Sequence, residues 1–219
     1  MSKNRNGNPW SYGVQFHETI LQPYDNLRML TEEEYGALAS FYILHSPCKG
    51  LSSQEISFEE RGWTGNISTN GLGAALDKLR VTHGGKFLLP SKQPPVRIPE
   101  TSSYMGMLFH YANLNDGYLS DLQTERVVAR CGGGSNAWLR LFRRIRNCLA
   151  HGNFRIVEID DGLGPSIIME DKTTGDKRSY TARMLFRLET LMRWKGYIEA
   201  GPTGSARFIS NLSIKRSPQ

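Results

Sequence analysis

The sequence predicts a mainly α fold, a bundle of helices with one β-hairpin inserted before the last long helix. Two observations predict it: apolar residues recur at helical spacing in most segments after the first 30, and the period changes to two only within residues 154–180. A chain of 219 residues is long enough for one hydrophobic core. We therefore expect an irregular amino-terminal arm (1–30), a single helical domain (31–200) and a loose carboxy-terminal tail (201–219).

The first helix is predicted by a capping box. Thr31 is followed three positions later by Glu34, so each side chain can bond the other's free backbone amide, and Pro47 ends the helix near His45. The residues at helical spacing, expected to be buried, are Tyr35, Leu38, Ala39, Tyr42 and Ile43. A second helix is expected over residues 72–80.

The middle of the chain begins with a proline-rich connector over residues 90–99, which holds four of the ten prolines. A third helix is expected after a cap at Thr101 or Ser102. Its predicted buried residues are Tyr104, Met105, Leu108, Phe109 and Ala112. A fourth helix is expected over residues 119–130, before the three glycines at 132–134.

The next helix is strongly basic and amphipathic. It should begin at Ser135 or Asn136 and end at Gly152, the residue type that most easily adopts a left-handed terminating conformation. Its predicted inward-facing residues are Trp138, Leu141, Phe142, Ile145, Cys148 and Leu149. Residues 138–157 contain no acidic side chain, so this segment is electropositive.

After Gly152 the alternation of apolar and polar residues predicts a hairpin. Strands are expected over 154–159 and 166–170, with room for a short third strand near 178–180. The last helix should begin at Ser179 or Thr181 and end before Pro202. Its predicted buried face holds Met184, Leu185, Leu188, Leu191, Met192 and Tyr197.

The basic helix carries residues suited to phosphodiester chemistry. Arg146 can hold the negative charge that develops on a phosphate under attack, through a planar fork of donors. His151 has the side-chain type that can accept and donate a proton near neutral pH. Positions five apart lie about 140° apart around an ideal helix, so we expect the helix to unwind near Gly152 and bring the two side chains together.

The string Arg146-Asn147-Cys148-Leu149-Ala150-His151 resembles the signature of the HEPN superfamily, in which an arginine and a polar residue precede a histidine on a late helix of a four- or five-helix bundle. The resemblance covers residues 135–155 in detail. It implies an HEPN-like bundle, and many members of that family are metal-independent endoribonucleases that act as dimers. The inserted hairpin departs from the plain bundle.

Under this resemblance the catalytic residues are Arg146, His151 and Asn147, with Asn147 bonding across the site or fixing an imidazole. Arg140, Arg143 and Arg144 are expected to bind flanking RNA phosphates. Cleavage proceeds by attack of the ribose 2′-hydroxyl, leaving a 2′,3′-cyclic phosphate and a 5′-hydroxyl. Because the chain has one motif histidine, a homodimer would supply the two needed for acid and base.

Composition agrees with a polyanionic partner. The net charge is +6 and 22% of residues are charged. We expect RNA as partner, no cofactor and no metal, a toxin or defence role with an antitoxin or regulatory protein as a further partner, and no membrane association. Three scattered cysteines fit a reducing, cytoplasmic location. A zinc site or catalytic thiol at Cys148 is disfavoured, since this residue falls on the apolar stripe.

Two other functions stay open. The chain could be a non-catalytic nucleic-acid or nucleotide-binding module, or a regulatory protein, that keeps the basic helix without turnover. It could also be a DNA-binding regulator that uses the hairpin as a protruding wing. An RNA cleavage assay with a His151 variant separates the first from the ribonuclease, and deletion of residues 156–178 tests the second.

Overall fold

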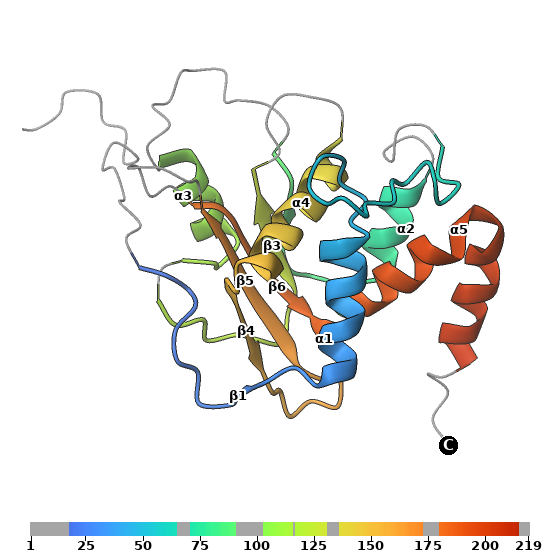
Figure 1. Ribbon diagram of the computed structural model, residues 1–219. Coiled ribbons are helices and arrows are strands. Elements are labelled where there is room, and N and C mark those ends of the chain that lie inside the picture. Colours follow the sequence, from blue (N-terminus) through green and yellow to red (C-terminus); the bar gives the residue numbers. More distant parts are fainter. Residues whose placement is uncertain are drawn as a thin grey trace, which may run out of the picture.

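A six-stranded mixed β-sheet forms the centre of the structure, with strand order β1-β4-β5-β6-β3-β2. The computed structural model describes residues 18–64, 71–90, 103–115, 117–130, 136–172 and 180–214. The mainly α bundle predicted from the sequence, and with it the HEPN-like fold, is therefore wrong: the chain has an α/β fold (Figure 1).

The elements follow one another along the chain as twelve segments. The strands are β1 (Leu27–Arg28), β2 (Phe87–Leu88), β3 (Arg126–Ala129), β4 (Phe154–Val157), β5 (Ser166–Lys172) and β6 (Tyr180–Arg187). The helices are α1 (Glu32–Leu38), the π-helical η1 (Ala39–Leu44), α2 (Leu72–Lys78), α3 (Ser103–Tyr111), α4 (Ala137–Ala150) and α5 (Leu188–Ile214). Strands β2 and β3 pair in parallel, and the other neighbours pair antiparallel.

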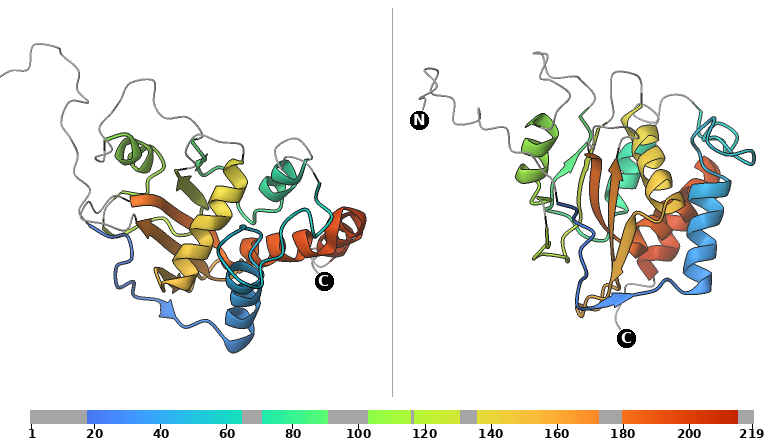
Figure 2. Two further views of the ribbon diagram at one scale, coloured as in Figure 1. Left: turned by 45° about the horizontal axis from the view of Figure 1, so that its top comes forward. Right: turned by 60° about the vertical axis from the view of Figure 1, so that its left-hand side comes forward.

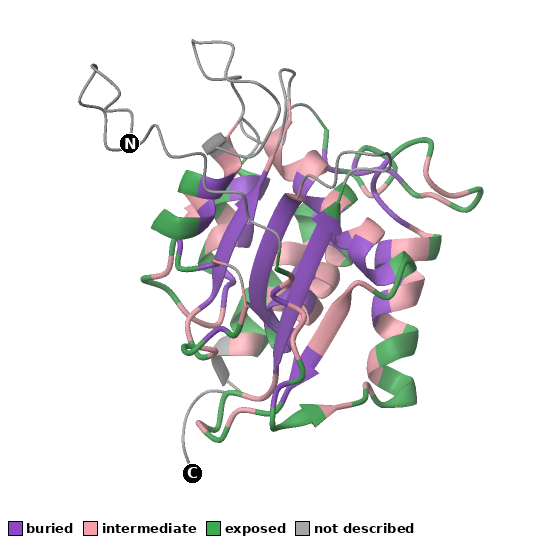
Figure 3. Cartoon of the chain, turned by 90° about the vertical axis from the view of Figure 1, so that its left-hand side faces the viewer, coloured by how far each residue is buried: buried purple, intermediate pink, exposed green. Residues whose placement is uncertain are grey.

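Helices cover both faces of the sheet (Figure 2). On one face, side chains of α1, η1, α2, α4 and α5 pack on alternate strand residues such as Ile167 and Met169. On the other face, α3 and the segment before β1 pack on the intervening residues, such as Ile168 and Leu185. This alternation follows from the two-residue period of a strand, and burial on both sides encloses β3, β5 and β6 along nearly their whole length (Figure 3).

The predicted hairpin is confirmed, but it is the middle of the sheet. Strand β4 pairs with β5 over Phe154–Val157, and β5 pairs with β6 along its whole length. The residues between β5 and β6, 173–179, lie outside the described residues. Because β5 and β6 are buried between neighbours, the hairpin cannot serve as the protruding wing of a DNA-binding regulator.

Parts of two helices predicted from the sequence are strands. Residues 126–129, expected within a fourth helix, form β3 between β2 and β6. Residues 181–187, expected in the last helix, form most of β6, and α5 begins only at Leu188. Met184 and Leu185 show the physical reason. These neighbouring residues pack into opposite cores, as successive residues of a central strand do and as those of an amphipathic helix do not.

The tail is also more ordered than expected. Helix α5 bends at Gly201, whose φ is 68°, and continues through Pro202 to Ile214. Phe208 of the second half packs on Tyr197 of the first, with ring centroids 6.1 Å apart, and a β-carbon at Gly196 would lie 2.6 Å from the Phe208 ring. The prediction of a loose tail from 201 is therefore wrong for residues up to 214, and 215–219 lie outside the described residues.

Predictions based on local sequence did better. The capping box of Thr31 and Glu34 is present, α1 and η1 together end near His45, and α2 lies where expected. Tyr35 is an exception because it is exposed, so the buried face of α1 begins at Leu38. The arm lies outside the described residues up to 17, but residues 18–30 include β1 and buried anchors such as Ile20.

The capping carboxylate leads to a testable pH dependence. The Arg28 guanidinium bonds Glu34, at 2.7 Å for the shorter contact, and lowers the Glu34 pKa from 4.5 to about 2. A carboxyl whose pKa is depressed by folding stabilises the fold above its ordinary pKa, and this stabilisation is lost as the pH falls toward the lower value. We expect Glu34→Gln to be less stable than wild type at pH 7 and to lose less stability between pH 4.5 and 2. Urea midpoints measured across that range test this, with Glu33→Gln as the exposed control in the same turn.

Candidate nucleic-acid interface on helix α4

Helix α4 forms where the sequence predicts it. The Asn136 side chain caps its first turn by accepting the backbone N–H of Leu139 at 3.2 Å, and the alternative cap, Ser135, lies outside the described residues. The apolar face is buried as predicted; its buried members are Leu141, Phe142, Ile145, Cys148 and Leu149. Trp138 is partly buried against the same core.

The carboxy-terminal end of α4 is a Schellman cap. The Asn153 N–H donates to the Cys148 carbonyl at 2.8 Å, and the Gly152 N–H donates to the Leu149 carbonyl at 3.4 Å. Gly152 has a φ of 67°, so the predicted left-handed terminator is confirmed. His151 is the last residue before this turn, and its side chain is exposed.

Four polar side chains form a line along α4 that ends at His151; the first three are partly buried and His151 is exposed. Arg140, Arg144, Asn147 and His151 occupy positions i, i+4, i+7 and i+11, which fall within about 60° of one another around a helix. We call these four residues the α4 row. Arg143 is exposed beside the row. The row combines cations, an amide and an imidazole on one partly exposed strip of the helix.

Arg146 lies on a different side of the helix. Its Nη2 donates to the Leu51 carbonyl at 2.9 Å, and its side chain is partly buried against the segment that follows η1. The helix stays regular up to His151, whose N–H still bonds the Asn147 carbonyl at 3.1 Å. The unwinding expected near Gly152 therefore comes too late, and within one subunit Arg146 and His151 stay about 140° apart around the axis.

Arg144 is anchored to the sheet. Its Nη1 donates to Oδ2 of Asp171 at 2.7 Å, and this carboxylate is buried at the end of β5. The same oxygen accepts the Thr181 hydroxyl from β6 at 2.7 Å. Asp171 thus supplies an acidic partner that the motif helix itself lacks.

Asp171 is the residue of this site that the sequence analysis missed. The predicted strand ended at residue 170, one position before Asp171. If its alternation is continued by one residue, Asp171 shares the face of Ile167 and Met169, which pack toward α4. What the alternation could not supply was the position of α4 along β5. The segment around Leu51, which holds Arg146, carried no sequence signal for its contact with α4.

The two described cysteines are inert core residues. Burial raises the pKa of Cys48 to about 11, although nearby Arg143 and Arg146 lower it, and burial raises the pKa of Cys148 well above its ordinary value. Their thiolate fraction at pH 7 is therefore small. In a Cys131→Ser background, we expect neither thiol to react with iodoacetamide until urea unfolds the chain. Rapid native labelling at Cys148 would contradict its burial.

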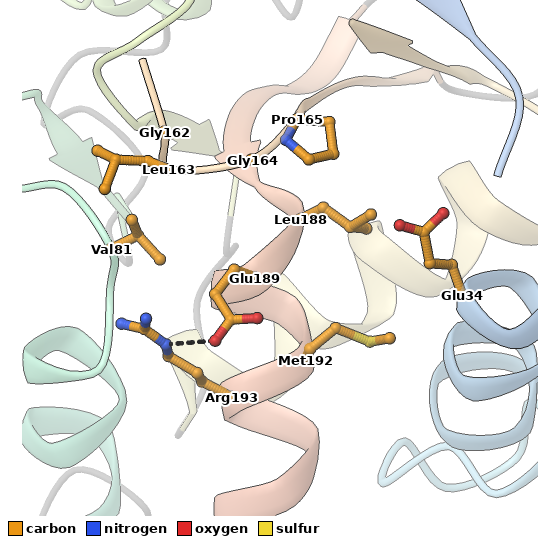
Figure 4. Close-up of a pocket in the computed structure, with 10 residues that line it drawn as sticks. All are labelled: Glu34, Val81, Gly162, Leu163, Gly164, Pro165, Leu188, Glu189, Met192 and Arg193. Carbon is orange, nitrogen blue, oxygen red and sulfur yellow. Dashed lines mark hydrogen bonds and ion pairs between the residues drawn. The ribbon is translucent and has the colours of Figure 1, made fainter. Parts of the chain in front are cut away.

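A separate pocket of about 680 Å³ lies away from this surface, where the β4–β5 turn faces α1 and α5 (Figure 4). Leu163, Leu188 and Met192 give it apolar walls, and its charged residues are partly paired, since Arg193 bonds Glu189 at 2.9 Å. None of the residues predicted to bind or cleave RNA lines it.

The comparisons with known proteins add no relative: no family model, curated protein or solved structure matches the chain. Among the described helices none has the length and apolar character needed to cross a membrane. In the same part of the chain, no three His, Cys, Asp or Glu side chains are grouped as metal ligands. The side chains of α4 are therefore the main indication of function.

Proposed function

We propose that the chain is a metal-independent endoribonuclease that binds RNA along the α4 row. The observation that carries the proposal is the exposure of His151 at the end of a line of cationic and amide side chains. Arginines bind phosphates without reading sequence, and a histidine at the end of the line can reach the ribose beside a bound phosphate. The motif's resemblance to HEPN ribonucleases supports the same chemistry.

In this proposal His151 transfers protons during transesterification. One imidazole removes the proton from the ribose 2′-hydroxyl, the 2′-oxygen bonds to phosphorus, and the bond from phosphorus to the 5′-oxygen breaks. A second imidazole protonates that leaving oxygen. Because each chain provides one His151 in its α4 row, the second comes from the partner in a homodimer.

Three further residues of α4 stabilise bound RNA. Arg140 and Arg143 bind phosphates on either side of the scissile bond, and Asn147 lies one turn from His151, where its amide can bond a phosphate or the imidazole. Arg146 can face the His151 of a partner subunit but not its own. We expect the protein in the cytoplasm, acting as a toxin or defence effector.

The test is incubation of purified wild-type protein with total RNA in EDTA. Fragments bearing 2′,3′-cyclic phosphate and 5′-hydroxyl ends, lost in His151→Ala, would support the proposal. RNA that stays intact after the same incubation would overturn the proposal. Fragments that persist unchanged with the His151→Ala protein would point to a contaminating nuclease.

A non-catalytic RNA-binding or regulatory function is the second candidate. It is favoured by the position of Arg146, which bonds the Leu51 carbonyl instead of joining its own His151. The same incubation distinguishes the two: RNA that is shifted on a gel but not cleaved, with equal binding by His151→Ala, would favour this candidate.

A further inference from the structure

We propose that Arg144, positioned by Asp171, is the motif helix's phosphate-binding arginine on the face of His151, and that Arg146 instead fastens the segment 46–57 to α4. This assignment rests on the proposed RNA-binding function. It moves Arg144 from a flanking phosphate to the phosphate beside His151, and it removes Arg146 from the RNA contacts that the motif suggests.

The angular positions of the side chains around α4 support Arg144 as the phosphate-binding arginine. Seven residues separate it from His151, which is close to two full helical turns and leaves the two side chains within about 20° on one face. Asn147 lies between them on the same face. A strand of RNA running along this face would meet Arg144, Asn147 and His151 in succession.

The ion pair fixes the direction of the Arg144 guanidinium. One Nη1 donor is used by Asp171, while among the described residues no hydrogen bond of Nη2 is formed. Since Asp171 is itself buried and bonded to Thr181, the arginine is held by a rigid partner. An oriented guanidinium loses less side-chain entropy when it binds a phosphate.

The contacts of Arg146 are those of a fastening residue. It bonds the Leu51 carbonyl, and about two turns earlier in the helix the Leu139 carbonyl accepts the Cys48 thiol at 3.3 Å. These two bonds hold the segment after η1 against α4. Removing Arg146 should loosen this segment without removing a charge from the α4 row.

A salt titration of RNA binding separates the two arginines. The probe is a fluorescent 12-nucleotide oligouridylate, and every variant carries His151→Ala so that cleavage does not interfere. Each phosphate contact contributes about 0.7 to the slope of log K against log salt for a single strand. The comparison pair is Asp171→Asn against Arg144→Ala/Asp171→Asn, since the double variant leaves no unpaired buried carboxylate.

We expect the slope to become about 0.7 smaller on adding Arg144→Ala. Arg146→Ala should leave the slope unchanged and should lower the urea midpoint of unfolding. The assignment would be overturned if the slope of log K against log salt fell with Arg146→Ala and did not change on adding Arg144→Ala. Binding with the expected slopes but no cleavage by wild type would remove the ribonuclease proposal and leave the assignment intact. Absence of binding would remove both.

Positioning by Asp171 has its own readout. Asn at 171 keeps the Arg144 charge, so a purely electrostatic role for Asp171 predicts tighter RNA binding after Asp171→Asn, because a negative charge is lost. We expect a different result when Asp171→Asn is made in the chain that keeps His151: RNA binding does not become tighter, and the single-turnover cleavage rate is several-fold lower. Tighter binding with an unchanged rate would show that Asp171 merely neutralises Arg144.

Discussion

Replacing His151 with alanine should reduce the single-turnover cleavage rate of RNA by about 10²- to 10⁴-fold, the usual contribution of a general acid or base. The loss should fall on the chemical step, because the imidazole is exposed and supports no contact that folding needs among the described residues. RNA affinity should change by less than about threefold. The measurement is a 5′-labelled oligonucleotide in EDTA at pH 7 with enzyme in excess, alongside a binding titration.

His110→Ala is the matched control. His110 is also exposed at the end of a helix, α3, but it lies on the opposite face of the sheet. This variant should cleave at the wild-type rate. Equal losses in both variants would show that the activity does not depend on the α4 row.

Replacing Arg187 with alanine should lower the free energy of unfolding by about 3–5 kcal/mol, the cost of breaking a buried charge network. Arg187 is fully buried at the end of β6. Its guanidinium bonds the Asp161 carboxylate, the Gly164 carbonyl at 2.5 Å and the Gln123 carbonyl at 3.2 Å, so it joins the β4–β5 turn to the segment before β3. Urea unfolding followed by tryptophan fluorescence measures the loss.

Lys195→Ala provides the scale for this measurement. Lys195 pairs with Glu199 one turn along α5 in a partly exposed i,i+4 bridge, which is typically worth about 0.3–0.5 kcal/mol. If Arg187→Ala lowers the free energy of unfolding by no more than Lys195→Ala does, the β4–β5 turn and the end of the sheet are held by their backbone contacts alone.

Elements encoded within a few neighbouring residues were predictable. The capping box at Thr31, the cap at Asn136 and the stop at Gly152 depend on side chains that act on their own turn, and all three occur. Strands β3 and β6 were not predictable in this way. Their pairing, Val127 opposite Met184, joins residues 57 positions apart, and the apolar run around Met184 and Leu185 fits helix and buried strand equally by periodicity.

The same distinction between local and long-range features applies to the candidate site. That Arg146 and His151 point to different sides of α4 follows from their spacing alone, and the expected unwinding failed because the Schellman cap begins only after His151. The Arg144 partner could not be found from the motif. Asp171 lies 27 positions away on a strand whose contact with α4 is set by tertiary packing.

Photo-crosslinking tests most directly whether the solvent face of α4 is the surface that binds RNA. An oligonucleotide containing 4-thiouridine would be irradiated with the full chain, and the crosslinked peptides would be identified by mass spectrometry. If RNA binds along α4, the crosslinks will be concentrated in residues 140–154 and weakened by high salt. Crosslinks confined to α3 and the opposite face of the sheet, with none in that segment, would contradict it.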